Sequence, residues 1–101
     1  VPALWLWEVG NVLVQAERRQ RITAAASREF LSLLETLPIV LEPPAAGVVW
    51  HDTLALARSH QLTAYDAAYL ELSMRRGLAI ATRDRELLRA AAAVGVIQLP
   101  T

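Results

Sequence analysis

The sequence predicts an α/β fold in which helices flank a mainly parallel sheet. Short apolar runs at residues 39–41, 78–81 and 96–99 alternate with longer segments whose apolar residues recur at helical spacing. Each run follows a proline or a glycine, as short buried strands often do. Strands that alternate with helices are typical of parallel sheets, because the helices supply the crossovers. We therefore expect the order helix, helix, strand, helix, helix, strand, helix, strand.

The strongest local pattern lies in residues 62–84, which predict a helix, a glycine stop, a buried strand and the start of a new helix. Thr63 is the expected N-cap of the first of these helices, with Asp66 three residues further on. Gly77 stands where a left-handed C-cap residue belongs. In open parallel sheets, binding sites lie beyond the carboxyl ends of the strands. Asp84 directly follows such an end.

The first helix is expected over residues 1–16, which offer a wide apolar face. Glu8, Asn11 and Gln15 fall at i, i+3 and i+7 and therefore share one polar stripe. An arginine cluster follows at the expected C-terminal end, where positive charge interacts favourably with the helix dipole. A solvated helix end is the simpler interpretation of this cluster, and contact with RNA is the alternative. The cluster consists of Arg18, Arg19 and Arg21.

Three further helices complete the predicted order. Thr23 is the expected N-cap of the second helix, which ends before Pro38. A third helix is expected over residues 45–58. The last helix begins at Asp84, and Gly95 ends it.

Composition indicates one small folded domain. A chain of 101 residues that is 54% hydrophobic can build one core and is too apolar for disorder. Ten basic residues, all arginine, balance ten acidic ones, so no overall field attracts a polyanion. Cysteine is absent, which excludes disulfides and thiolate metal sites. No apolar run approaches a membrane span and no signal peptide is visible, so we expect a cytoplasmic protein without membrane contact.

Three acidic residues are candidates for chemistry: Glu8, Asp66 and Asp84. Glu8 stands alone in an apolar segment, where a buried unpaired carboxylate would be costly. If the three converge, they offer the oxygen ligands that a hard cation such as Mg²⁺ prefers. Each acid also has a purely structural interpretation. Asp66 can complete a variant capping box, Asp84 can cap a helix, and Glu8 can simply be exposed.

Two longer patterns can be compared with known families. The first is Leu62-Thr63-x-Tyr65-Asp66-Ala67-x-Tyr69-Leu70 followed by Ala81-Thr82-x-Asp84, and the second is Pro2-x-Leu4-x-x-x-x-Glu8-x-x-Asn11-x-Leu13. Together they resemble the motifs of PIN-domain ribonucleases, and in particular those of the VapC-type toxins of bacterial toxin–antitoxin pairs. The resemblance covers essentially the whole chain.

This resemblance implies a three-layer α/β domain with a mainly parallel central sheet flanked by helices. It implies that Glu8, Asp66 and Asp84 are catalytic acids that bind Mg²⁺ or Mn²⁺, and that Asn11 and Thr82 orient these ligands. The implied activity is that of a metal-dependent endoribonuclease toxin, which hydrolyses RNA phosphodiesters with an activated water. The implied partners are RNA and a cognate antitoxin, and we expect a homodimer.

Members of the family open with an Asp-bearing strand and a helix before the Pro-x-Leu motif, and this sequence begins at that motif. We therefore expect one PIN-like domain over residues 1–101 that is incomplete at its N-terminus. The absent Asp favours an alternative, a catalytically inactive interaction module that binds an antitoxin or another copy of itself. A third hypothesis is a phosphate-binding α/β protein without nuclease chemistry, which would bind phosphate compounds without needing Glu8.

Overall fold

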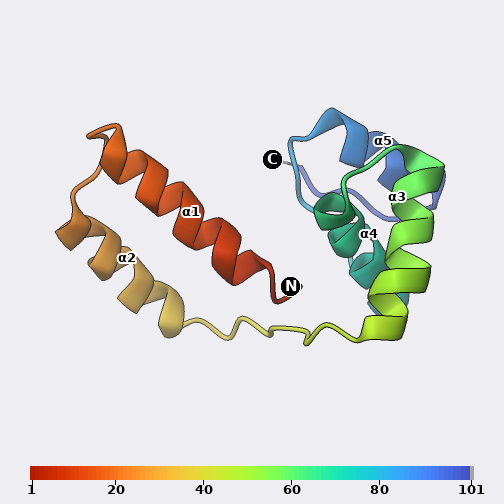
Figure 1. The fold of residues 1–101 in the computed structure, drawn as a ribbon, viewed down its shortest axis with the longest axis horizontal. Coiled ribbons are helices and arrows are strands. Elements are labelled where there is room, and N and C mark those ends of the chain that lie inside the picture. Colours follow the sequence, from red (N-terminus) through yellow and green to blue (C-terminus); the bar gives the residue numbers. More distant parts are fainter. Residues whose placement is uncertain (101) are drawn as a thin grey trace. The chain divides into compact units, whose positions relative to one another are not determined.

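The computed structural model describes residues 1–100, and the regular structure within them is helical. The helices in chain order are α1 (Trp5–Arg18), α2 (Ala24–Glu35), the π-helix η1 (Val48–Thr53), α3 (Leu54–His60), α4 (Ala64–Arg76) and α5 (Arg85–Ala93) (Figure 1). The chain divides into two compact units. Unit 1 comprises Val1 and Ala3–Glu42, and unit 2 comprises Pro2 and Pro43–Thr101. No helix within residues 1–100 is both long and apolar enough to cross a membrane.

Unit 1 is built from α1 and α2, which face each other across an apolar groove of about 210 Å³. Thr23 is the N-cap of α2, as predicted, because its Oγ1 accepts a hydrogen bond from the backbone nitrogen of Ala26 at 3.1 Å. Leu13 and Ser27 are the only buried residues among those described in this unit. Its core is therefore small.

The predicted strand at residues 39–41 does not form. The chain there is extended, and the neighbouring Glu42 makes two backbone bonds with the start of the chain. The nitrogen of Glu42 donates to the carbonyl of Val1 at 2.8 Å, and the nitrogen of Ala3 donates to the carbonyl of Glu42 at 3.2 Å. The N-terminal nitrogen of Val1 also donates to the carbonyl of Val40 at 2.8 Å. These three bonds join only the end of the segment to the start of the chain, which is too short for a ladder.

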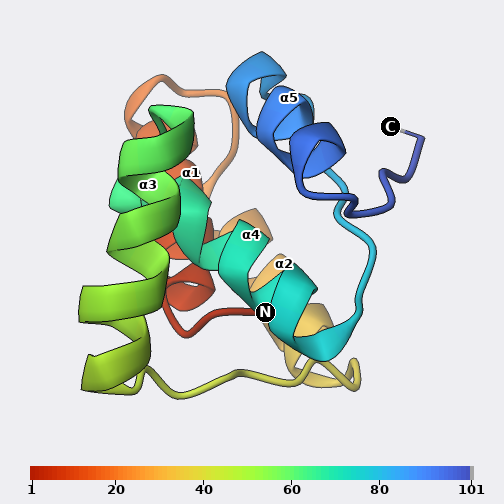
Figure 2. The same cartoon turned by 90° about the vertical axis from the view of Figure 1, so that its right-hand side faces the viewer.

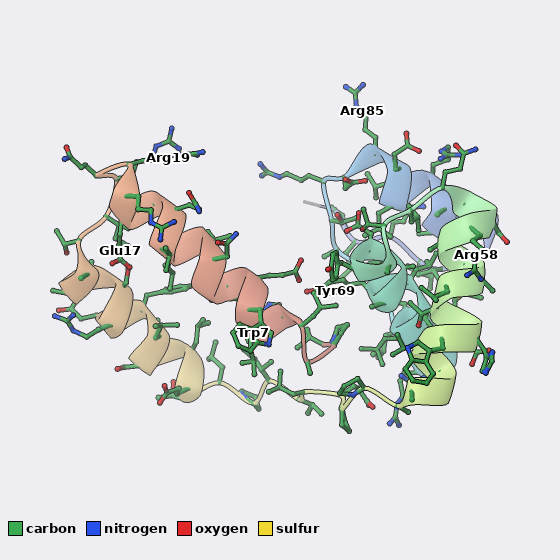
Figure 3. The ribbon with its side chains drawn as sticks, in the orientation of Figure 1. Trp7, Glu17, Arg19, Arg58, Tyr69 and Arg85 are labelled. Carbon is green, nitrogen blue, oxygen red and sulfur yellow. The ribbon has the colours of Figure 1, made fainter. Side chains whose placement is uncertain are left out.

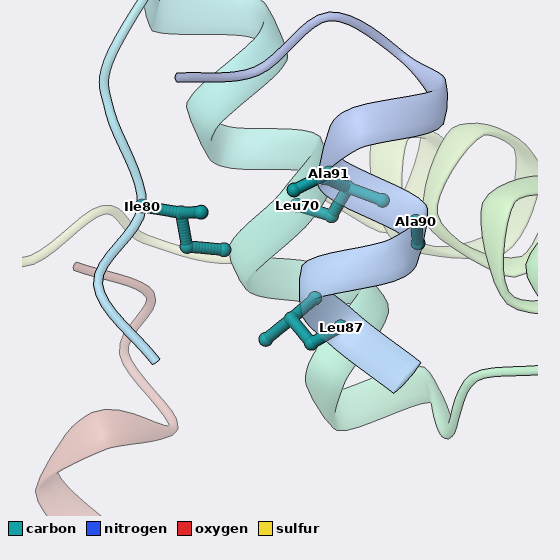
Figure 4. Packing of buried hydrophobic residues seen from close by; sticks show 5 residues of the cluster. All are labelled: Leu70, Ile80, Leu87, Ala90 and Ala91. Atoms are coloured by element: carbon teal, nitrogen blue, oxygen red, sulfur yellow. The ribbon is translucent and has the colours of Figure 1, made fainter. Parts of the chain in front are cut away.

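In unit 2, α4 is the central helix. It packs against η1 and α3 and also against α5 (Figure 2). The core is a cluster in which the side chains of α4 and α5 meet one residue of the extended segment between them (Figure 4). Its members are Leu70, Ile80, Leu87, Ala90 and Ala91. Leu70, Ala90 and Ala91 are completely buried, so this contact defines how α4 and α5 are held together.

The predicted sheet is not confirmed within residues 1–100. The expected strands at 78–81 and 96–99 meet only at one bridge, between Ile80 and Gln98, and that bridge is parallel as predicted. The nitrogen of Ile80 donates to the carbonyl of Ile97, and the nitrogen of Leu99 donates to the carbonyl of Ile80, both at 2.9 Å. Two short segments without a third neighbour form a marginal pair at best. This explains why the apolar runs are extended without forming regular strands.

The predicted helix ends in unit 2 are confirmed. Thr63 is the N-cap of α4, with its Oγ1 accepting from the backbone nitrogen of Asp66 at 3.1 Å. Gly77 has a φ of 63° and ends α4 in the left-handed conformation. Gly95 has a φ of 79° just beyond α5. Both glycines adopt a backbone conformation that is costly for residues with a Cβ.

Two other helices end at glutamines in this same conformation, which the sequence did not predict. Gln20 has a φ of 57° beyond α1, and Gln61 has a φ of 56° at the end of α3. The π-helix η1 was also unexpected, because the sequence predicted a regular helix over residues 45–58. The helical rod that η1 and α3 form extends to His60.

Candidate functional site

Two of the three candidate acids lie at the starts of helices that pack together. Asp66 is in the first turn of α4 and is partly buried, and Asp84 is the N-cap of α5. Leu70, one turn after Asp66, belongs to the same buried cluster as Leu87, in the first turn of α5. The packing of α4 against α5 therefore fixes the two helices from whose N-terminal ends these carboxylates project.

Asp84 uses one carboxylate oxygen for structure. Its Oδ1 accepts a hydrogen bond from the backbone nitrogen of Leu87 at 2.9 Å, which caps α5. Within residues 1–100, no protein donor contacts the other oxygen, Oδ2. The carboxylate can therefore cap the helix and still offer an oxygen to a ligand.

Thr82 holds the backbone at the start of α5. Its Oγ1 accepts a hydrogen bond from the backbone nitrogen of Asp84 at 3.1 Å. The bond restrains the backbone of the turn that precedes the helix, and with it the direction of the Asp84 side chain. The expectation that Thr82 orients the metal ligands stays a prediction.

The hydrogen bond by which Thr63 caps α4 uses the backbone nitrogen of Asp66 and not its carboxylate. The Thr63 hydroxyl accepts from the backbone nitrogen of Asp66, which any residue at that position except proline would supply. The structural function of Thr63 and a chemical function of the Asp66 side chain can therefore be separated by mutation.

Glu8 and Asn11 belong to unit 1. Glu8 lies in the first turn of α1, Asn11 lies one turn further along the same helix, and both are exposed. The candidate residues are thus divided between the units, with Glu8 and Asn11 in unit 1 and Asp66, Thr82 and Asp84 in unit 2.

The carboxylate oxygens of the candidate acids in unit 2 are the type of ligand that a hard divalent cation prefers. Mg²⁺ is commonly bound by one or two carboxylates, with water and substrate phosphates completing its coordination. Asp66 and Asp84 provide oxygen ligands of this type. Within either unit, over residues 1–100, no group of three or more histidine, cysteine or acidic side chains forms a site for a metal ion.

The sequence did not predict the shape of the turn between α1 and α2. An open hollow of about 460 Å³ lies there, and its lining is Glu17, Gln20, Arg21, Ile22, Thr23 and Ala24. The arginines near this turn were visible in the sequence. The turn itself was not, because glutamine is not a residue that indicates a left-handed backbone.

The chain matches the family model described as PIN domain over residues 1–93. The protein named Exonuclease VapC9 from Pyrobaculum aerophilum is 37% identical over 86 residues, which make up 84% of this chain and 61% of that protein. A crystal structure of PAE2754 from Pyrobaculum aerophilum is similar with a TM-score of 0.74 and 34% sequence identity, covering 96% of this chain and 63% of that one. The chain therefore spans about three fifths of the length of these relatives. The family match extends through both units.

Proposed function

The chain belongs to the PIN-domain family, and from this premise we propose that it is a metal-dependent endoribonuclease of the VapC type that hydrolyses RNA phosphodiesters. The observation that carries the proposal is the placement of Asp66 in the first turn of α4 and of Asp84 at the N-cap of α5, two helices joined by one buried cluster. The similarity to a protein named as a VapC exonuclease supports nuclease chemistry on the same domain.

In this proposal, Glu8, Asp66 and Asp84 hold Mg²⁺ or Mn²⁺. Asp84 contributes the oxygen that does not cap α5, and Thr82 keeps the turn before the helix in place. Asn11 follows Glu8 by one helical turn and helps to orient it. A divalent cation in such a site supplies an activated water and stabilises negative charge on a phosphate.

We further propose that RNA and a cognate antitoxin are the partners, in a toxin–antitoxin pair, and that the chain acts as a homodimer. The resemblance of its motifs to VapC-type toxins supports these partners, and the name of the relative agrees with that family.

A pair of variants tests the metal site. Asp66→Asn should abolish Mn²⁺ binding while leaving the stability of the metal-free protein unchanged or higher, because Asn keeps the backbone bond to Thr63. Thr63→Ala should do the opposite, costing about 1 kcal/mol of stability through loss of the N-cap while leaving Mn²⁺ affinity unchanged. Titration calorimetry with Mn²⁺ and thermal unfolding in EDTA measure the two properties separately.

The two variants serve as controls for each other. If Asp66→Asn bound Mn²⁺ as tightly as the unmodified chain, the acid would have only a structural function and the metal site would be elsewhere. If Thr63→Ala unfolded at an unchanged midpoint, α4 would begin at another residue.

The name of the relative favours a second mode of cleavage, from the ends of the nucleic acid. A circular RNA distinguishes the two modes because it has no ends. We expect cleavage of both circular and linear RNA of the same sequence in the presence of Mn²⁺, with neither cut in EDTA. Cleavage of the linear RNA alone would identify an exonuclease instead.

The exposed apolar side chains of unit 1 favour the alternative of an inactive interaction module. Trp7, Leu33 and Val40 are each at least 60% exposed, and exposed apolar surface commonly marks a site of protein association. A protein that forms dimers but fails to cleave any RNA with Mn²⁺ present would have this function and not that of a nuclease.

A further inference from the structure

We propose that the turn between α1 and α2 is a second contact surface for RNA, which binds backbone phosphates through Arg18, Arg19 and Arg21. We call residues 18–21 the arginine turn. The inference rests on the proposed function for the identity of its ligand, and it adds a binding surface outside the acidic site.

The arginine turn is held by hydrogen bonds between backbone groups and not by its side chains. The nitrogen of Arg21 donates to the carbonyl of Ala16 at 2.9 Å, and the nitrogen of Gln20 donates to the carbonyl of Glu17 at 3.0 Å. With Gln20 in the left-handed conformation, these two bonds form a Schellman motif. The carbonyls of Gln15, Ala16 and Glu17 therefore have backbone partners, and the arginine side chains are not needed to cap them.

The three arginine side chains are also free of acidic partners. All three are exposed, and within residues 1–100 no carboxylate pairs with any of them. Arg75 and Arg89 differ, because Glu71 and Glu86 respectively form ion pairs with them. In a chain with no net charge, the arginine turn places three unpaired positive charges within four positions.

The nearby acid does not neutralise this surface. Glu17 lines the hollow beside the turn together with Arg21, without forming an ion pair. Figure 3 shows Glu17 pointing toward the space between α1 and α2, whereas Arg19 points away from both helices. Arg19 therefore lies on the outer side of the turn, while the exposed Arg21 borders the hollow, so the surface that we propose runs from the outer side of the turn to the rim of the hollow.

Arginine suits this task because its planar guanidinium donates two parallel hydrogen bonds to one phosphate. The binding constant of a protein for single-stranded nucleic acid falls as salt is added. In a plot of log K against log salt concentration, each phosphate that the protein neutralises steepens the slope by about 0.7. Three phosphate contacts thus account for a slope of about 2. This contribution does not depend on base sequence.

The test measures equilibrium binding of a single-stranded oligoribonucleotide to the full chain in EDTA, at several salt concentrations. The first variant replaces all three arginines with glutamine, and the second replaces them with lysine. Arg19→Gln and Arg58→Gln form a matched pair, because both arginines are exposed and unpaired but Arg58 lies on α3 in unit 2. Thermal unfolding midpoints verify that all variants fold alike.

We expect the triple glutamine variant to lose about 2 from the salt slope and to bind about a hundredfold more weakly near 0.1 M salt. The lysine variant should keep most of the slope, because it keeps the charge. Arg19→Gln should reduce the slope by about 0.7, and Arg58→Gln should leave it unchanged. Equal slopes for the unmodified chain and the triple glutamine variant would overturn the inference, as would equal effects of Arg19→Gln and Arg58→Gln.

Failure of this inference can be told from failure of the proposed function. Binding is measured without metal, so the slope does not depend on cleavage. A chain that never cleaves RNA with Mn²⁺ but loses binding in the triple glutamine variant refutes the nuclease and supports the arginine turn. A chain that cleaves RNA with unchanged slopes supports the nuclease and refutes the arginine turn.

Discussion

Asp84 caps α5 with one carboxylate oxygen and can still offer the other to a ligand, although the sequence presents these two interpretations as alternatives. Its Oδ1 caps α5 through the nitrogen of Leu87, and this bond leaves Oδ2 for another ligand. An N-cap carboxylate has two oxygens and the cap uses one of them, so a structural interpretation does not exclude a chemical one. The same reasoning separates the Asp66 side chain from the backbone nitrogen that Thr63 caps.

Gly77 and Gly10 should respond to alanine in opposite ways. A Cβ at either position would meet nothing within 4 Å, so backbone conformation alone decides. Gly77 has a φ of 63°, and alanine there should cost about 1 kcal/mol. Gly10 lies inside α1, and alanine there should add about 0.5–1 kcal/mol of helix stability. Urea unfolding of the two variants measures both changes, and a loss at Gly10 would contradict the open space around it.

At the scale of elements, α4 contains an ion pair between two residues one turn apart. Glu71 is buried, and Arg75 one turn later donates to both of its carboxylate oxygens, at 2.6 and 3.3 Å. A buried carboxylate depends on such donors, because charge is costly away from water. The ion pair with Arg75 therefore allows α4 to have a buried glutamate, Glu71.

Removing the guanidinium group of Arg75 should therefore destabilise the protein. The Arg75 side chain is 39% exposed, so solvent screens the pair and we expect Arg75→Met to cost about 2 kcal/mol, below the range for fully buried pairs. Arg58→Met is the control, because Arg58 is exposed and makes no ion pair within residues 1–100, and it should change stability by less than about 0.5 kcal/mol. Equal unfolding midpoints for the two variants would show that Glu71 has another sufficient donor.

At the scale of the whole molecule, the two units differ in how much they bury. Unit 2 has a cluster of five buried apolar residues on two helices and one extended segment. In unit 1, the described residues that are buried are Leu13 and Ser27. Units near 40 residues rarely bury enough apolar surface to be stable alone. The stability of the chain should therefore be concentrated in unit 2.

Hydrogen exchange should reveal this difference. Backbone amides of α4 and α5 beside Leu70 and Ala90 should exchange most slowly, and those of α2 should exchange faster, because local opening follows the amount of buried contact. Mass spectrometry of peptides from each helix after labelling measures the rates. Equal protection of α2 and α4 would mean that unit 1 has stabilising contacts beyond Leu13 and Ser27.

The candidate site was foreseeable residue by residue, but not as an arrangement. Thr82, Asp84 and Asp66 occupy the positions at helix starts that the sequence assigned to them. Their capping contacts join groups two or three residues apart, so the local pattern contains them. The packing of Leu70 against Leu87, Ala90 and Ala91 of α5 emerges only when the helices come together.

The sequence by itself determined the family of the chain, the helices, and the ends marked by Thr23, Thr63, Gly77 and Asp84, because each of these ends depends on hydrogen bonds between near neighbours. The tertiary structure decided what pairs over long distances. Residues 78–81 and 96–99 have the composition of strands, yet they meet at one bridge, because a strand exists only where a neighbouring segment supplies the opposite row of hydrogen bonds. The glutamine ends of α1 and α3 are local, since their backbone bonds span no more than five residues, but the sequence does not reveal them because glutamine, unlike glycine, does not indicate a left-handed backbone.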